Sequence, residues 1–344
     1  MIHATTAAPG HARRTTAAVP RPPIGLLTAI ATACAVILAV LAVAALRRDA
    51  PGRGATAAAF PARLTSHLTS PQGEAGSWRE PADVAIGERR WLLDTGNNRV
   101  LELAADGSVA QTIAAEPPLS RPMALATDGS SLYVADSGAA RVVVFGADGH
   151  QLRAFPVGGV WGDALPARPI GIAVAGNGDV LVSDAANQRV LRYDAAGQLL
   201  WSAGNGRRAA GVAGFNTPAG LALDAAGNVY AVDILNGRVV KLAPDGTYVS
   251  EFGHLGDTAG ALARPKDVAV DAAGNVYVSD GLLAAVQVFG PGGEYRGFIG
   301  LKAPADRGSG ALFRSPAGLA ISGSALYVVD RLSSVFVLEL PGAP

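Results

Sequence analysis

A short apolar run that ends in aspartate recurs six times along this chain of 344 residues. Successive aspartates lie 42 to 50 residues apart, and they are Asp94, Asp136, Asp184, Asp233, Asp280 and Asp330. A period of this size is typical of tandem structural units, each of which buries its apolar surface by packing against its neighbours. The repeat therefore constrains the fold more strongly than any other feature of the sequence.

The fourth unit shows what one repeat contains. Four short runs of apolar, β-branched or aromatic residues occupy 220–223, 229–232, 238–242 and 248–252, and each is closed by Gly, Asp, Asn or Pro. The inner runs are almost continuously apolar, as in strands buried on both faces, and the outer run alternates. Helical periodicity is absent from the repeats, so the sequence predicts an all-β, six-bladed β-propeller of four-stranded blades.

Three motifs recur in the units: Pro-x-[Gly/Asp]-apolar-Ala, Gly-Asn-Val-Tyr-Val-x-Asp and Asn-x-Arg-Val. Together they resemble the NHL repeat, over about residues 81–340. The third and fourth units match best, whereas the fifth has Ala285 at the arginine position and the sixth diverges after Asp330. The resemblance implies a six-bladed propeller. Two enzyme families use such propellers: gluconolactonase-type hydrolases with a divalent metal in the channel, and amidating lyases with zinc held by histidines.

The pattern also places the strands. Inner strands are expected at 83–86, 123–126, 170–174, 220–223, 267–270 and 318–321. The sixth unit offers only three runs, so residues 60–68 are expected to add the outer strand of the last blade, beside residues 335–340. Such closure removes the exposed sheet edge of an open ring. The propeller domain is therefore expected over 60–344.

The N-terminal region has a different composition. Residues 1–23 are rich in Ala, Thr, Pro and Arg without any acid, which predicts a disordered tail. Residues 24–46 carry no charge and are long enough to cross a bilayer as one helix, at about 1.5 Å per residue. Residues 47–59 are expected to be a flexible tether. An uncleaved anchor is favoured over a cleaved signal peptide, and Cys34 is a poor lipoprotein site because the apolar run continues beyond it.

The orientation in the membrane rests on weaker signals. Three arginines precede the apolar segment and three follow it, so the positive-inside rule does not separate the two directions. The segment is the chain's one export signal, and the tail before it carries no recognisable domain. We therefore expect a single-pass membrane protein with the tail inside and the propeller on the extracytoplasmic side.

Charge excludes one class of partner. The whole chain has a net charge of zero, but the first 48 residues hold five arginines and no acid, which leaves a net charge of −5 on the remainder. Nucleic-acid binding requires clustered positive charge to neutralise phosphates. A mildly acidic propeller is therefore not expected to bind nucleic acid.

Two features recur where the loops entering the inner strands meet the loops between second and third strands. One is the set of aspartates, for which a scaffold role is expected because Arg99, Arg141, Arg189 and Arg238 each follow an aspartate by five residues and can pair with it. The other is an arginine just before the proline of five repeats: Arg79, Arg121, Arg168, Arg264 and Arg314. These arginines either pack against the next blade or bind an anionic partner.

The central channel offers few polar residues. Near its entry the inner strands carry Asp83, Lys266 and Asp267. The two aspartates either serve turn geometry or face each other across the mouth and bind a cation. The propeller histidines, His67, His150 and His254, fall at unrelated repeat positions and do not predict a zinc site.

Taken together, these features favour a membrane-tethered, non-catalytic propeller that binds a protein or small ligand as a sensor, adhesion or assembly module. The binding-face candidates are the five arginines together with Asp83, Lys266 and Asp267. No catalytic residue, metal or cofactor is predicted, and an enzyme is the less favoured class. The alternative is a metal-dependent hydrolase or lyase of gluconolactonase or amidating-lyase type that uses the channel.

Overall fold

The computed structural model describes residues 59–71, 77–160, 163–212, 214–300, 312–332 and 334–341. The expected tail, apolar segment and most of the tether (1–23, 24–46 and 47–59) lie outside these residues. Within the described part of the chain, no helix has the length and apolar character needed to span a bilayer.

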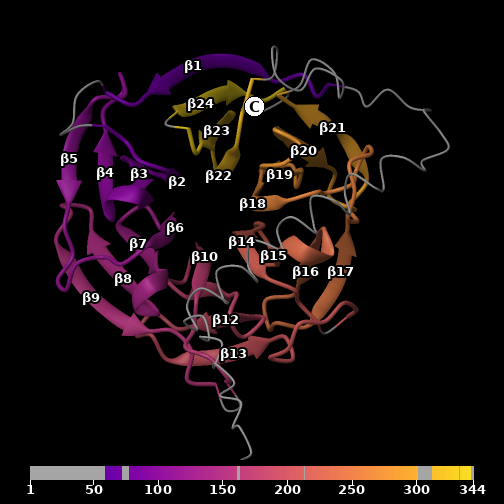
Figure 1. Ribbon diagram of the computed structural model, residues 1–344, viewed down its shortest axis with the longest axis horizontal. Helices are drawn as coiled ribbons and strands as arrows, with labels where there is room; N and C mark the ends of the chain where they lie inside the picture. The colour runs from indigo at the N-terminus through magenta and orange to yellow at the C-terminus, as the bar shows by residue number, and fades with distance from the viewer. Residues whose placement is uncertain are drawn as a thin grey trace, which may run out of the picture. The chain divides into compact units, whose positions relative to one another are not determined.

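Six sheets of four antiparallel strands form a ring around a central axis (Figure 1). Blade one contains β2 (Pro81–Ile86), β3 (Arg90–Asp94), β4 (Arg99–Leu103) and β5 (Val109–Ile113). Blade two contains β6 (Pro122–Thr127), β7 (Ser131–Asp136), β8 (Arg141–Gly146) and β9 (Gln151–Pro156). Blade three contains β10 (Pro169–Val174), β11 (Val180–Asp184), β12 (Arg189–Tyr193) and β13 (Leu199–Ala203).

Blades four to six complete the ring. Blade four contains β14 (Pro218–Leu223), β15 (Val229–Asp233), β16 (Arg238–Leu242) and β17 (Tyr248–Phe252). Blade five contains β18 (Pro265–Val270), β19 (Val276–Asp280), β20 (Ala285–Phe289) and β21 (Tyr295–Ile299). Blade six contains β22 (Pro316–Ser322), β23 (Ala325–Asp330), β24 (Ser334–Glu339) and the N-terminal strand β1 (Arg63–Thr69). The predicted six-bladed fold and its inner strands are confirmed.

One register is common to all six blades. The proline that starts each inner strand lies opposite the aspartate that ends the second strand, as Pro81 lies opposite Asp94 and Pro218 opposite Asp233. A register shift follows the proline in every blade. A proline has no N–H to donate to a ladder, so it is tolerated at the first position of a strand. The repeated Pro-to-Asp unit is therefore the unit of blade geometry.

The N-terminal side closes the ring, as predicted. Strand β1 pairs antiparallel with β24, from Arg63 opposite Glu339 to Thr69 opposite Ser334 (Figure 1). The strand begins three residues later than expected because Phe60 is used differently. Its N–H donates to the Phe298 carbonyl at 2.7 Å, and its ring lies 6.0 Å from that of Tyr277, edge to face. The chain thus contacts blade five before it enters blade six.

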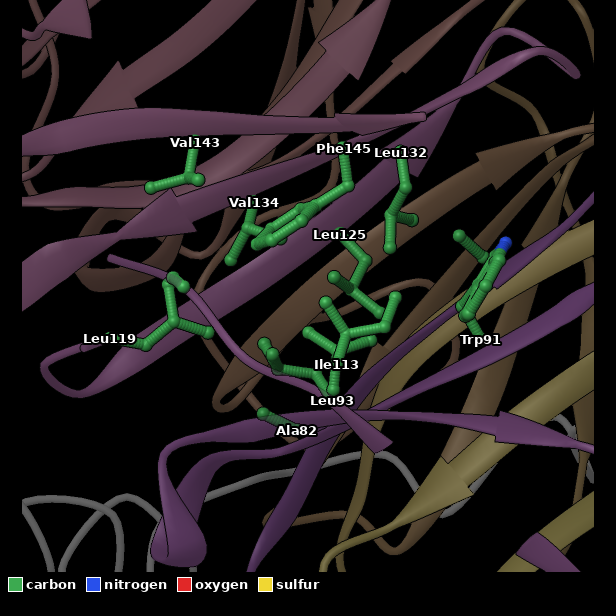
Figure 2. Packing of buried hydrophobic residues seen from close by; sticks show 13 residues of the cluster. Ala82, Trp91, Leu93, Ile113, Leu119, Leu125, Leu132, Val134, Val143 and Phe145 are labelled. Atoms are coloured by element: carbon green, nitrogen blue, oxygen red, sulfur yellow. The ribbon is translucent and has the colours of Figure 1, made fainter. Parts of the chain in front are cut away.

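The core lies between adjacent blades. Figure 2 shows the cluster between blades one and two, where Trp91 and Leu93 of β3 lie near Leu125 of β6 and Phe145 of β8. Complete burial of a side chain of this size stabilises the fold by about 1.5–3 kcal/mol. The second strands are buried on both faces, whereas β9 alternates between exposed and covered positions. These burial patterns match the two hydrophobic patterns read from the repeat.

Candidate anion-binding face and central channel

The six repeated aspartates hold the loops that enter the inner strands. Each carboxylate accepts a hydrogen bond from a backbone N–H one or two residues before the proline of its own blade. The first of these bonds runs from the Arg79 N–H to Asp94 at 2.6 Å, and the third from the Arg168 N–H to Asp184 at 2.8 Å. The other donors are the amides of Ser120, Asn216, Ala263, Arg264, Arg314 and Ser315. The aspartates are scaffold residues.

Three of the four expected aspartate–arginine pairs form. Arg99 with Asp94, Arg141 with Asp136 and Arg238 with Asp233 form ion pairs at 2.7, 2.7 and 3.0 Å. Their carboxylates are fully buried, which strengthens a charge-assisted hydrogen bond.

The prediction of the fourth pair is wrong. Arg189 forms its ion pair with Asp163 at 2.9 Å, in the loop that leads into blade three. Asp184 instead accepts hydrogen bonds from the Asn187 amide and from backbone N–H groups. Arg189 is thus ion-paired with a carboxylate of another loop, while Asp184 has other hydrogen-bond donors.

Blades five and six lack the arginine five residues after the aspartate, and backbone N–H groups donate to the carboxylate instead. Asp280 accepts the N–H groups of Leu282 and Leu283 with one oxygen, and those of Ala263 and Arg264 with the other. Burial raises the pKa of Asp280, and four N–H donors oppose that rise. Divergence of the motif therefore leaves the loop geometry intact.

The five arginines before the prolines extend their side chains from loops whose backbones the aspartates hold. All five are exposed. Among the described residues, no hydrogen bond or ion pair holds any of their guanidinium groups. Their backbone N–H groups either donate to the repeated aspartates or belong to residues next to such donors. Packing against the next blade, one of the two expected roles, therefore gains no support from polar contacts.

A sixth cationic loop was not predicted. Blade four has Asn216 and Thr217 where the other blades have arginine, but its entering loop carries exposed Arg207 and Arg208 upstream. Arg208 and Arg168 line one cavity of about 350 Å³ with the small residues Ala140 and Ala186. Sequence reasoning missed Arg208 because it lies outside the repeat. All six loops that enter inner strands thus carry an exposed arginine on the same face.

The channel opens on this face. Its cavity of about 130 Å³ is lined by the first residues of all six inner strands, and by Ile234 and Arg331 from loops that follow second strands. Asp83, Lys266 and Asp267 all line it, so the structure brings together the three polar residues that the sequence singled out. Arg331 is an addition, and it pairs with exposed Glu80 at 3.0 Å.

Asp83 and Asp267 tie neighbouring blades together. Asp83 of blade one accepts the N–H of Leu125 in blade two at 2.7 Å. Asp267 of blade five accepts the N–H of Leu319 in blade six at 2.8 Å. Gly318, beside Leu319, lies so close to Asp83 that a Cβ there would collide with its carboxylate. The two carboxylates therefore both contact strand β22 from its two sides, and each already accepts main-chain hydrogen bonds.

The channel shifts the pKa values of its charged groups. Burial, and then the charge of Asp267, raises the pKa of Asp83 well above its usual range. Burial raises the pKa of Asp267 to about 7. For Lys266, burial and then the nearby Arg264 and Arg331 lower the pKa to about 8. Desolvation disfavours the charged form of an acid and of a base alike, which explains the opposite directions.

A channel metal of the kind that the enzyme families hold does not fit these residues. The cavity presents two carboxylates, and both accept main-chain hydrogen bonds. Within the described ranges, no three His, Cys, Asp or Glu side chains come together as metal ligands. None of His67, His150 and His254 is among the residues that line the cavity. His67 instead stacks on Phe336 at 4.2 Å, on the outer side of blade six.

The fold and this face define the class as a six-bladed β-propeller with a cationic face around a narrow channel. Residues 167–193, which include β10, β11 and β12, match the family model of the NHL repeat. This match to one repeat and the ring of six blades support an NHL-repeat six-bladed β-propeller. No curated protein matches it by sequence.

Several solved structures share the fold. Virginiamycin B lyase from Staphylococcus aureus is 13% identical with a TM-score of 0.56, over 80% of this chain and 98% of that one. A gluconolactonase from Xanthomonas campestris is 18% identical with a TM-score of 0.58, over 85% and 99%. A Bacteroides thetaiotaomicron protein of unknown function is 15% identical with a TM-score of 0.63, over 83% and 75%. At these identities the likeness establishes the fold alone.

Proposed function

We propose that the propeller is a non-catalytic binding module that recognises an anionic partner on its arginine-bearing face. The observation that carries this proposal is that Arg79, Arg121, Arg168, Arg264 and Arg314 are exposed, and that within the described ranges their guanidinium groups have no hydrogen-bond or ion-pair partner, on loops whose backbones are fixed. A guanidinium group is suited to bidentate recognition of carboxylates. Loops on a rigid scaffold are where binding residues are usually found.

The test compares two triple variants of the full-length chain. The first is Arg121→Ala/Arg168→Ala/Arg264→Ala on the proposed face. The matched control, Arg89→Ala/Arg90→Ala/Arg296→Ala, removes the same charge from the opposite face. The Arg296–Glu294 pair there is solvent-exposed and contributes little, and Arg89 is itself exposed although its partner Glu102 is largely covered.

Both variants should melt close to the parent chain, because surface changes usually stay within about 0.5 kcal/mol each. Capture of the partner from native membranes should fall at least about tenfold for the first variant. The control variant should still capture the partner, and capture by the parent chain should weaken as the salt concentration rises. Equal capture by both variants would place recognition elsewhere, and unfolding of the first would make the arginines structural.

Residues 24–46 motivate a second part of the proposal: the propeller is tethered to a membrane by this segment and lies on its extracytoplasmic side. The support is the length of uncharged sequence. The chain should stay in the membrane fraction after an alkaline carbonate wash, and protease added outside intact cells should digest the propeller. Release of a soluble form that starts beyond residue 46 would indicate a cleaved signal peptide instead.

A catalytic function is the second candidate, and one observation favours it. Asp83, Lys266 and Asp267 line one cavity and have shifted pKa values, an arrangement common at catalytic sites. The chain should be assayed against a gluconolactone and virginiamycin B, the compounds that the names of the fold relatives suggest, with and without divalent cations. We expect no turnover. Turnover that disappears in Asp267→Asn would establish the enzyme and displace the binding module.

A further inference from the structure

Lys266 differs from the other charged groups of the channel. Asp83 and Asp267 accept main-chain N–H groups, and Arg331 pairs with Glu80. Lys266 is half-buried in the cavity wall, and no hydrogen bond or ion pair engages its amine among the described residues. A partly buried charge without a counter-ion is unfavourable, so such a group indicates a candidate binding site for an anion.

The surroundings of Lys266 are cationic on the side of the mouth. Arg264 precedes it on the entering loop, and Arg331 lines the same cavity from the loop after β23. Burial lowers the pKa of the Lys266 amine most, both arginines lower it further, and Asp280, at the end of β19, opposes them. Lys266 and Arg331, from two blades, therefore line the same cavity where the channel opens, Arg264 is near enough to act on the amine, and the counter-ion of Arg331 is Glu80 rather than a group at Lys266.

Lys241 provides a comparison within the same fold. It lies on β16 with its amine 3.2 Å from Asp224 and 2.7 Å from the Tyr230 hydroxyl, and these partners raise its pKa. The chain has three lysines, Lys241, Lys266 and Lys302, and Lys302 lies outside the described residues. A paired and an unpaired lysine can thus be compared directly.

We propose that the channel mouth binds a carboxylate group against Lys266, with Arg331 and Arg264 beside it and the apolar part of the ligand in the channel below. The walls there are apolar, with Met123, Ile170, Ala219 and Leu221 among them. The cavity of about 130 Å³ suits a small ligand. A singly charged head fits better than a phosphate, because Asp267 and Asp280 lie nearby and repel a dianion when they are ionised.

This inference rests on the proposed recognition of anions by this face, and it names one compact site within it. The test is ligand-observed NMR on the full-length chain with butyrate, its neutral analogue butyramide, and inorganic phosphate. Butyrate should bind and butyramide should not. Lys266→Met should abolish the butyrate signal, whereas Lys241→Met should leave it unchanged.

The pH profile separates a direct contact from a structural role. Above about 8, affinity for butyrate should fall as the Lys266 amine loses its proton, by up to about tenfold per pH unit. Asp267, whose pKa is about 7, titrates below this range and should give a separate, smaller step. Lys266→Arg should keep binding and lose the fall at high pH, because a guanidinium stays charged.

Several outcomes would overturn the proposal: no butyrate binding, equal binding of butyramide, or unchanged binding in Lys266→Met. Preferential binding of phosphate would replace the carboxylate by a phosphate site. Lys266→Met removes an uncompensated charge, so it should melt no lower than the parent chain. Partner capture that depends on Arg121 and Arg168 is measured separately, so failure of the small-ligand site would not be mistaken for failure of the proposed function.

Discussion

The carboxylate of Asp83 accepts the N–H of Leu125 at 2.7 Å, and this bond joins the inner strands of blades one and two across the channel wall. The same position of blade five, Asp267, makes the corresponding bond to blade six. Asp83 and Asp267, which are candidates for binding at the channel mouth, therefore also join neighbouring blades. A substitution at either residue tests both roles.

Removal of the Asp83 side chain should destabilise the propeller. In Asp83→Ala the buried N–H groups of Leu125 and Val84 lose their acceptor. The free energy of unfolding should fall by at most about 1–3 kcal/mol for each N–H group. Asp83→Asn keeps an acceptor oxygen and should cost clearly less. Urea denaturation gives the difference, with Asp106→Ala in an exposed turn as the control. Equal stability of Asp83→Ala and the parent would show that the bond contributes nothing.

Stability should decline as the pH rises toward neutrality. Asp83 and Asp267 have pKa values raised in the fold, so the folded chain holds their protons more tightly than the unfolded chain does. Their contribution is complete below the unfolded value of 3.8 and is lost as the pH passes through the folded value, about 7 for Asp267. Melting temperatures measured across this range should show less pH dependence in Asp83→Asn/Asp267→Asn. An identical profile in that double variant would contradict the assignment.

The buried ion pair of blade four should be more costly to break than an exposed one. Arg238 and Asp233 are almost fully buried, so Arg238→Ala leaves a carboxylate without its charged partner and should cost about 3–5 kcal/mol. Arg296→Ala, which breaks an exposed pair with Glu294, should change the free energy of unfolding by less than about 1 kcal/mol. Chemical denaturation of the two variants side by side measures the contrast, and similar losses would argue that burial is unimportant here.

The closing strand should be essential to the stability of the ring. Deletion of residues 60–70 removes β1 and exposes the edge of β24. It also removes Leu68 from its cluster with Trp78 and Val335 and uncovers the other two residues. Leu68→Ala alone should cost about 2–5 kcal/mol, and the deletion more. Thr65→Ala, at an exposed position of the same strand, is the control. Unchanged thermal melting of the deletion variant would exclude closure through β1.

The repeated features of the sequence predicted the repeated features of the structure. The Pro-to-Asp unit marked all six inner strands, and the missing fourth run of the last unit predicted closure by β1. Both succeed because a strand ladder depends on local patterns of period two and on turn residues.

Features outside the repeat could not be predicted. Asp163, which forms an ion pair with Arg189 in place of Asp184, occurs in a loop with no counterpart in other blades. Arg208 reaches the cavity of Arg168 from a loop of irregular length. Arg331 meets Lys266 only because ring geometry brings blades five and six together at the channel. Side-chain neighbours between blades depend on loop paths and ring closure, which a single repeat does not encode.

The pairing of β1 with β24 also has a mechanical consequence. All residues that precede β1 in the chain are attached to the propeller through this strand, which is the outermost strand of blade six. Any pulling force on them is therefore applied to the seam between the first and last strands. The hydrogen bonds of that strand pair, together with the preceding bond from the Phe60 N–H to the Phe298 carbonyl, and not the stability of the six blades as a whole, set the load at which the ring would open.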